Sequence, residues 1–300
     1  MANQAELIVD ARNATGESPV WIASEQALYW VDIPNRQLQR WAAADASVTR
    51  WTGEQMVACI ARRDGAANRW IAGMEDGVFD ITPQDDGTLA ATRLIDVQHG
   101  HGGMRFNDGR CDRQGRFWAG TMVMDMAAGI PAGALYRFDG SASDGSLAAQ
   151  INDFVVPNGL GFSPDGRTMY LSDSHPSVQC IWAFDYDIDS GTPSNRRLFV
   201  DMTQYAGRPD GAAVDVDGCY WICGNDAGLI HRFTPDGRLD RSLQVPVKKP
   251  AMCAFGGSGL DTLFVTSIRP GGDLSDQPLA GGVFALQPGV CGLEETPFRQ

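Results

Sequence analysis

Residues 104–122 read MRFNDGRCDRQGRFWAGTM and contain the structural unit that recurs along the whole chain. A short strand begins with polar residues, among them Arg105 and Asn107, and ends at a turn over residues 112–115. A second strand, rich in aromatic residues, follows the turn. Short apolar or alternating runs bounded by Gly and Asp are typical of β-strands joined by tight turns. The stretch therefore predicts two neighbouring antiparallel strands with polar groups at their entrance.

The unit recurs at regular spacing. Each copy has a polar approach, a strand, a turn, an aromatic-rich strand, a loop and a third strand. The six copies cover residues 16–41, 56–81, 104–139, 156–186, 208–233 and 250–286. Outer fourth strands are expected near residues 48–51, 91–95, 148–154, 196–201 and 239–244. Four-stranded units that repeat about every 40–50 residues are typical of a β-propeller. A β-sandwich rarely needs so many strands, and a β-helix has a shorter period.

We therefore predict an all-β fold, a six-bladed β-propeller with four antiparallel strands per blade, in a single domain over residues 1–300. Residues 6–11 precede the first unit and could form an extra strand. We expect this N-terminal strand to join the last blade and close the ring, since a closed ring leaves only short sheet edges exposed.

Charge and composition exclude several classes of function. The formal net charge of -13 argues against a nucleic-acid partner, because phosphate contacts need clustered Lys and Arg. No run of about 18 apolar residues predicts a membrane span, and the N-terminus lacks the pattern of a signal peptide. The seven Cys are scattered without a CxxC pair, which indicates neither a zinc site nor a disulfide framework. We expect a cytoplasmic protein with reduced thiols, as a monomer or small homo-oligomer.

Polar residues recur where the first strands of four units begin. They are Glu17 in GESPVW, Asn107 in RFNDGR, Asn158 in VPNGLGF and Asp210 in RPDGAAV. Asn107 and Asn158 are 51 residues apart, and Asn158 and Asp210 are 52 apart, which is one blade each. Equivalent positions of successive blades converge on the central channel, so we predict one cluster at its mouth. Asn-Gly and Asp-Gly are also common turn dipeptides, so the argument depends on the recurrence.

The cluster has the chemistry of a metal site. Two carboxylates and two carboxamides would all ligate a metal through oxygen. Oxygen ligands suit a hard divalent cation such as Ca²⁺, Mg²⁺ or Mn²⁺ and tolerate Zn²⁺ or Fe²⁺. So few protein ligands leave coordination positions for water and substrate, as metal-assisted catalysis requires.

Several motifs resemble the senescence marker protein/gluconolactonase family, which includes regucalcin. They are GESPVW, RFNDGRCDRQGRFWAGTM, PNGLGFSPDGRTMYLSDS, RPDGAAVDVDG and MCAFGGSGLDTLFVTS. The resemblance spans residues 16–286 in order and at family spacing. It implies a six-bladed propeller with one divalent metal ion at the channel mouth. The family's metal-binding residues fall on Glu17, Asn158 and Asp210. Its substrate-binding residues fall on Arg105, Asn107 and Asp125, the last being a glutamate in some relatives.

The resemblance also implies an activity, the metal-dependent hydrolysis of a sugar lactone to the corresponding aldonic acid in carbohydrate catabolism. The metal would polarise the lactone carbonyl, Asp210 would act as the base, and Arg105 would stabilise the oxyanion. Asn107 and Asp125 would hold ring hydroxyls. Two alternatives stay open: a non-catalytic, regucalcin-like protein that binds a divalent cation, and a propeller that serves only protein interactions. The sugar, the lactone ring size and the metal are not determined at this point.

Overall fold

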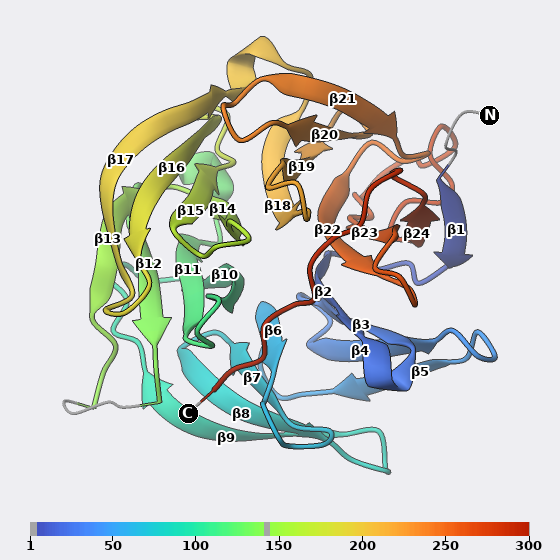
Figure 1. The fold of residues 1–300 in the computed structure, drawn as a ribbon. Helices are drawn as coiled ribbons and strands as arrows, with labels where there is room; N and C mark the ends of the chain where they lie inside the picture. The colour runs from blue at the N-terminus through green and yellow to red at the C-terminus, as the bar shows by residue number, and fades with distance from the viewer. Residues whose placement is uncertain (1–4, 141–144, 300) are drawn as a thin grey trace.

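A computed structural model describes residues 5–140 and 145–299. It contains six four-stranded antiparallel sheets arranged as blades around a central axis (Figure 1). The predicted all-β, six-bladed propeller is therefore confirmed. Within each of the first five blades the strands follow one another outward in chain order.

The blades have the following strands. Blade 1 contains β2 (Gly16–Ile22), β3 (Ala27–Asp32), β4 (Gln37–Ala42) and β5 (Val48–Thr52), and blade 2 contains β6 (Cys59–Arg62), β7 (Trp70–Gly73), β8 (Gly77–Pro83) and β9 (Leu89–Asp96). Blade 3 contains β10 (Met104–Cys111), β11 (Phe117–Val123), β12 (Gly133–Phe138) and β13 (Ala149–Phe154), and blade 4 contains β14 (Pro157–Phe162), β15 (Thr168–Asp173), β16 (Cys180–Asp187) and β17 (Thr192–Asp201). Blade 5 contains β18 (Arg208–Val214), β19 (Tyr220–Asn225), β20 (Leu229–Phe233) and β21 (Leu239–Gln244). Blade 6 contains β22 (Pro250–Gly256), β23 (Thr262–Ser267), β24 (Val283–Leu286) and β1 (Glu6–Val9). Three single-turn 3₁₀-helices, η1 (Ala23–Glu25), η2 (Met126–Ala128) and η3 (Met202–Gln204), lie between strands.

The N-terminal strand closes the ring, as predicted. β1 is the outermost strand of blade 6 and pairs antiparallel with β24, with Leu7 opposite Phe284 and Val9 opposite Val283. The last blade is thus built from both ends of the chain (Figure 1). This pairing ties the segment that leads into blade 1 to the outer edge of blade 6.

The second strand of every blade contains a buried aromatic residue. The six are Trp30, Trp70, Trp118, Tyr170, Trp221 and Phe264. Aromatic contacts join neighbouring blades: the rings of Tyr29 and Trp70 are 4.6 Å apart, and those of Trp21 and Phe264 are 5.2 Å apart. Such large side chains bury much apolar area and account for the repeated pattern in the sequence.

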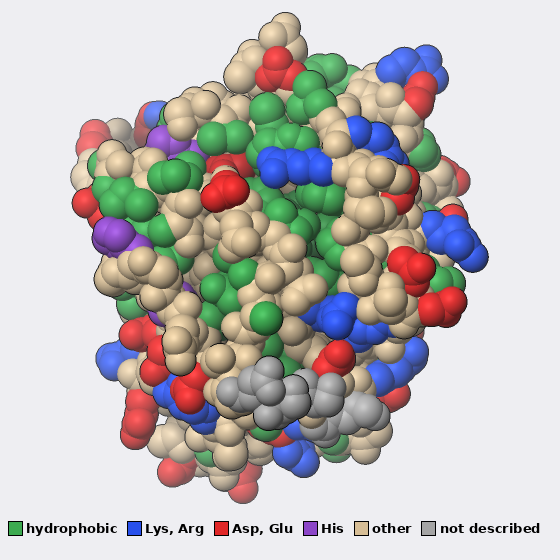
Figure 2. Space-filling model, turned by 90° about the vertical axis from the view of Figure 1, so that its left-hand side faces the viewer, with side chains coloured by type: hydrophobic (Ala, Val, Ile, Leu, Met, Phe, Trp, Pro, Cys, Tyr) green, Lys and Arg blue, Asp and Glu red, His purple; other side chains and the backbone are tan. Residues whose placement is uncertain are grey.

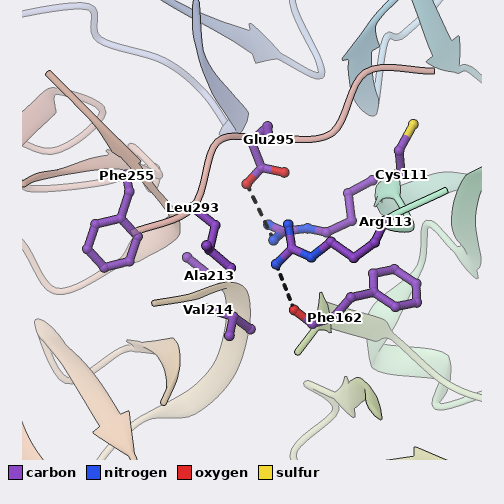
Figure 3. A pocket seen from close by; sticks show the side chains of 9 residues that line it. Cys111, Arg113, Phe162, Ala213, Val214, Phe255, Leu293 and Glu295 are labelled. Carbon is purple, nitrogen blue, oxygen red and sulfur yellow. Dashed lines mark hydrogen bonds and ion pairs between the residues drawn. The ribbon is translucent and has the colours of Figure 1, made fainter. Parts of the chain in front are cut away.

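The C-terminal segment covers one end of the central channel. It crosses the centre of Figure 1, and Figure 3 shows Glu295 and Leu293 of this segment facing side chains from β10 and β18. Glu295 forms an ion pair of 3.4 Å with the buried Arg110, and Phe298 is 1% exposed. Arg110 lies near the end of β10, so the segment covers the channel at the ends of the inner strands. Their beginnings face the opposite side of the propeller.

Charged side chains of both signs lie on the surface of the propeller (Figure 2). On the side that carries β13 and β17, acidic and basic side chains are interspersed over the surface (Figure 2). No helix in the described residues has the length and apolarity that crossing a membrane requires. All seven cysteines lie within the described residues as free thiols.

Candidate functional site

A cavity of about 270 Å³ lies where the inner strands begin, and it brings together most of the predicted site residues. Its border includes Glu17 of β2, Arg105 and Asn107 of β10, Asn158 of β14, and Asp210 of β18. These residues are up to 193 positions apart in the sequence, and the propeller brings them to one channel mouth. The convergence follows from their equivalent places in four blades.

A local break in strand pairing occurs at each of these positions. The register between first and second strands shifts after Glu17 in β2, after Phe106 in β10, after Asn158 in β14 and after Pro209 in β18. Extra residues of this kind bend a strand and turn a side chain out of the regular alternation. Gly159 follows Asn158 with a φ of 62°, and Ser18 follows Glu17 with a φ of 49°, which is unusual for a residue with a side chain. The site residues therefore stand beside backbone that departs from regular β-structure.

Amide groups hold one side of the cavity in place. Arg105 Nη1 donates to Asn107 Oδ1 at 3.0 Å, and Asn107 Nδ2 donates to Asn158 Oδ1 at 3.0 Å. Asn158 Nδ2 in turn donates to Ser174 Oγ at 2.6 Å, and that hydroxyl donates to the carbonyl of Pro209. The chain of bonds fixes which atom of each amide faces its neighbour. Asn158 Oδ1 accepts one hydrogen bond and keeps a second lone pair.

The two carboxylates of the cavity are buried close to each other. Glu17 is 8% exposed and Asp210 is 7% exposed. Burial, followed by the nearby carboxylates of Asp210 and Asp108, raises the pKa of Glu17 well above its ordinary value. Burial also raises the pKa of Asp210 to about 7, although the Asn225 amide, which donates to Asp210 Oδ2 at 2.6 Å, lowers it. Two buried carboxylates that repel each other hold protons more tightly, or favour a cation between them.

A third buried carboxylate lies next to this pair. Asp108 is 5% exposed, and its Oδ2 accepts a hydrogen bond from the Leu160 amide at 2.9 Å. Its Oδ1 is buried without a hydrogen-bond partner. Burial raises the pKa of Asp108, and Arg110 opposes this rise. The acidity of the region thus extends from the cavity toward the channel.

The donor set fits a hard divalent cation. Glu17, Asn158 and Asp210 offer two carboxylates and one amide oxygen at a single cavity, and Glu17 Oε1 and Asp210 Oδ1 accept no hydrogen bond within the described residues. Across residues 5–140 and 145–299, no three His, Cys, Asp or Glu side chains come together as a metal-binding group. The fit therefore rests on the amide oxygen together with the two carboxylates.

Asp125 lies apart from the other predicted site residues. Its side chain is exposed at the start of η2, and it is not among the residues that border the cavity. The adjacent Met126 borders the cavity in its place. The predicted contact between Asp125 and a ligand therefore stays a prediction.

Five polar residues of the cavity border were not predicted. They are Thr15, Ser174, Arg208, Asn225 and Lys249. Ser174 follows β15 and Asn225 ends β19, and Asn225 lies directly opposite Arg208 in the strand pairing. The signal was present in the repeats, because antiparallel pairing puts the end of each second strand beside the beginning of the first. Lys249 immediately precedes β22 and has the place in blade 6 that Arg208 has in blade 5.

Comparisons with known proteins agree with this geometry. Residues 15–269 match the family described as SMP-30/Gluconolactonase/LRE-like region. The chain is 36% identical to 6-deoxy-6-sulfogluconolactonase of Pseudomonas putida, over 99% of both chains. It is also 36% identical to L-arabinolactonase of Azospirillum brasilense, over 99% of this chain and 96% of that protein.

Among solved structures, the crystal structure of a calcium-binding protein, regucalcin, from Agrobacterium tumefaciens superposes with a TM-score of 0.89 at 26% identity, and covers 100% of this chain and 99% of that one. The family match covers most of the sequence, and both lactonases exceed 30% identity over almost the full length. The chain therefore belongs to the SMP-30/gluconolactonase/LRE-like family.

Proposed function

We propose that the protein is a metal-dependent lactonase that hydrolyses a sugar lactone to the corresponding hydroxy acid. The observation that carries the proposal is the pair of buried carboxylates, Glu17 and Asp210, which share a cavity with the amides of Asn107 and Asn158. Relatives that cover almost the whole chain are named as lactonases, which supports the same reaction class.

The size and lining of the cavity suit a monosaccharide. Its volume of about 270 Å³ is slightly below the range of roughly 300–1,000 Å³ of pockets for drug-sized ligands. Amide, carboxylate and guanidinium groups border it together with a few apolar side chains such as Val156 and Ile268. Paired polar groups select ring hydroxyls, because a ligand that lacks a hydroxyl leaves them unpaired.

Glu17, Asn158 and Asp210 would hold the divalent cation. Such a cation, when bound, polarises a carbonyl group and lowers the pKa of a water molecule. We propose a hard or borderline divalent ion and no single element, because oxygen ligands discriminate weakly among Ca²⁺, Mg²⁺, Mn²⁺, Zn²⁺ and Fe²⁺.

Side chains of the protein carry out proton transfer, stabilise the developing negative charge and orient the groups involved. Asp210, a buried carboxylate whose Oδ2 is held by the Asn225 amide, accepts a proton from the attacking water. The water oxygen bonds to the carbonyl carbon, and Arg105 donates to the oxygen that becomes negative. The ring C–O bond then breaks, the ring oxygen takes back the proton held by Asp210, and the new carboxylic acid loses its proton to solvent and leaves as a carboxylate. Burial lowers the pKa of Arg105 to about 10, so it keeps its charge at neutral pH. Asn107 orients Arg105 and Asn158 through its two hydrogen bonds. We assign no role to Asp125 in these steps.

A panel of aldonolactones tests the proposal. Metal-stripped protein is assayed for acid release after addition of each of the five cations, beside Asp210→Asn. We expect turnover that depends on the cation and is lost in the variant. If no lactone is opened faster than in buffer with any cation, the lactonase proposal is wrong.

The second candidate is a protein that binds a divalent cation without catalysis. The similarity to a calcium-binding regucalcin structure supports it, and the same three residues would hold the ion. A mere ion site has no need of Arg105 beside the cavity, where its side chain is held by Asn107. Calcium binding without turnover of any lactone would favour this candidate.

A further inference from the structure

Two positively charged side chains that border the cavity have no role in the steps above. Arg208 begins β18, two residues before Asp210, and Lys249 lies just before β22. Both side chains are mostly buried, with exposed fractions of 19% and 26%. Both lower the pKa of Asp210, so their charges reach the reacting end of the cavity.

The two cations share a single carboxylate. Arg208 Nε donates to Asp226 Oδ2 at 2.6 Å, and the ammonium group of Lys249 contacts Asp226 Oδ1. Arg208 Nη1 also donates to the Ser174 carbonyl at 3.2 Å, while its Nη2 has no hydrogen-bond partner in the described part of the chain. One carboxylate offsets one of the two charges, which leaves an excess of positive charge on this side.

The rest of the cavity does not remove this excess. The carboxylates that border the cavity are Glu17 and Asp210, and neither forms an ion pair with Arg208 or Lys249. Arg105 adds a further positive charge and forms no ion pair with any described carboxylate. Arg208 and Lys249 share one carboxylate, so their charges are only partly compensated, and a neutral sugar lactone brings no charge that completes the pairing.

We propose that Arg208 and Lys249 form a subsite for an anionic substituent of the sugar lactone, a sulfonate, phosphate or carboxylate group. Arg208 offers a planar fork of donors, and Lys249 a point charge, which together suit a tetrahedral or planar anion. The subsite lies between blades 4, 5 and 6, where Arg208 reaches the Ser174 carbonyl and Lys249 the side chain of Asn225. The assignment rests on the proposed lactonase function. The subsite would make the substrate of this protein resemble that of one relative more than that of another at equal sequence identity. One of the two is named for a sulfonated lactone and the other for an uncharged one.

Steady-state kinetics on matched lactones test the subsite. The anionic substrates are 6-deoxy-6-sulfogluconolactone, 6-phosphogluconolactone and glucarolactone, and the neutral ones are gluconolactone and arabinonolactone. We expect kcat/KM for at least one anionic lactone to exceed that of its neutral counterpart about tenfold, which is about 1.4 kcal/mol. The three anionic lactones also show which anion the subsite prefers. The preference should weaken as salt is raised, because partly exposed charges are screened.

Two variants and a matched control locate the effect. Arg208→Gln and Lys249→Met should raise KM for the anionic lactone about tenfold more than KM for the neutral one, and Lys249→Arg should restore most of the loss. Lys248→Met is the control, because Lys248 is 55% exposed, pairs with Asp276 and borders a different hollow. It removes the same charge one residue away and should change neither KM by more than about twofold. Thermal unfolding shows that each variant is folded.

Binding of the open-chain product gives a second readout. The affinity of 6-phosphogluconate, measured by calorimetry, should fall about tenfold in Lys249→Met and not in Lys248→Met. Equal kcat/KM for charged and neutral lactones, or variants that affect both alike, would overturn the subsite and leave the lactonase proposal standing. If no lactone is opened, the lactonase proposal fails by itself, and the binding measurement still decides: an unchanged affinity in Lys249→Met rejects the subsite.

Discussion

In the metal-free protein, the substitution Asp210→Asn is expected to raise the free energy of unfolding at pH 8, although it removes a residue proposed to be essential for activity. Asp210 is 7% exposed and shares its cavity with the buried carboxylate of Glu17. Asn has almost the same shape, carries no charge, and can still accept the hydrogen bond that Asn225 donates to Asp210 Oδ2. The variant therefore removes the charge while it keeps the packing.

The magnitude follows from the pKa of Asp210, which burial raises from 3.8 to about 7. Because the folded protein holds this proton more tightly than the unfolded chain, the stabilising contribution is complete below about pH 4 and is lost as the pH rises through about 7. One pKa unit corresponds to about 1.4 kcal/mol, so ionised Asp210 costs up to about 4 kcal/mol at pH 8. Asn avoids most of this cost and also relieves the repulsion on Glu17.

Thermal and urea unfolding in the presence of a chelator, at pH 5 and pH 8, measure the effect. At pH 8 the variant should be more stable than the wild type by about 2–4 kcal/mol, or about 4–8 °C at about 2 °C per kcal/mol. At pH 5, where folded Asp210 keeps its proton but the unfolded chain is about one pKa unit above 3.8, the gain should shrink to about 1–2 kcal/mol. Calcium at 100 times its dissociation constant should add about 2.7 kcal/mol to the wild type and far less to the variant.

A second Asp→Asn variant serves as the control. Asp236 lies in an exposed turn, where the Thr234 hydroxyl lowers the pKa of its carboxylate. Asp236→Asn removes the same charge and should not stabilise the protein at pH 8. The reasoning is refuted if Asp210→Asn is no more stable than the wild type at pH 8 without metal. It is also refuted if the gain is as large at pH 5, because the gain would then not come from the charge.

Three further predictions concern the same region. Because the pKa values of Glu17 and Asp210 are raised, calcium affinity should increase with pH through about 7, where Asp210 loses its proton, with proton release seen by calorimetry in buffers of different ionisation heat. A pH-independent affinity would contradict this. Asn107→Ala, which removes the amide between Arg105 and Asn158, should lower kcat/KM about 30- to 100-fold, or about 2–3 kcal/mol, with little change in the melting temperature; a loss of stability in proportion to activity would mean that Asn107 is merely structural. Gly159→Ala should destabilise the protein by about 2–3 kcal/mol in urea unfolding, because φ is 62° there and a Cβ would overlap the Tyr220 hydroxyl. Tyr220→Phe should recover part of that loss, and the overlap is not the cause if it recovers none.

The repeated pattern was sufficient to predict the architecture. The aromatic residues of the second strands, from Trp30 to Phe264, pack between blades, so they recur wherever a blade recurs. The same periodicity brought Glu17, Asn158 and Asp210 to one cavity before any contact was known, since equivalent positions converge on the channel. The C-terminal segment repeats nothing, and its position over the channel, with Glu295 on Arg110, could not be read from a pattern.

The cavity residues that the sequence did not predict reach the site through contacts between strands and do not recur at one position of each first strand. Asn225 reaches Asp210 only because β19 ends opposite the beginning of β18, and Arg208 lies on the same strand as Asp210, two residues before it. Asp125 shows the opposite case. It has the sequence position that the resemblance implies, but it sits at the start of η2, where loop geometry and not strand register sets the direction of its side chain.

The register shifts of the inner strands explain why the site belongs to some blades and not to others. The inner pairing shifts in blades 1, 3, 4, 5 and 6, whereas β6 of blade 2 pairs with β7 without a break. In the described part of the chain, blade 2 is also the blade that contributes no residue to the cavity border. A regular strand alternates its side chains between the two faces of its sheet, where they pack against neighbouring blades. A strand with an inserted residue can turn one side chain toward the axis while the rest keep their packing. The propeller can therefore place polar groups at the channel mouth without removing apolar ones from its core, and the choice of blades that carry a bulge decides which side of a bound ligand meets protein.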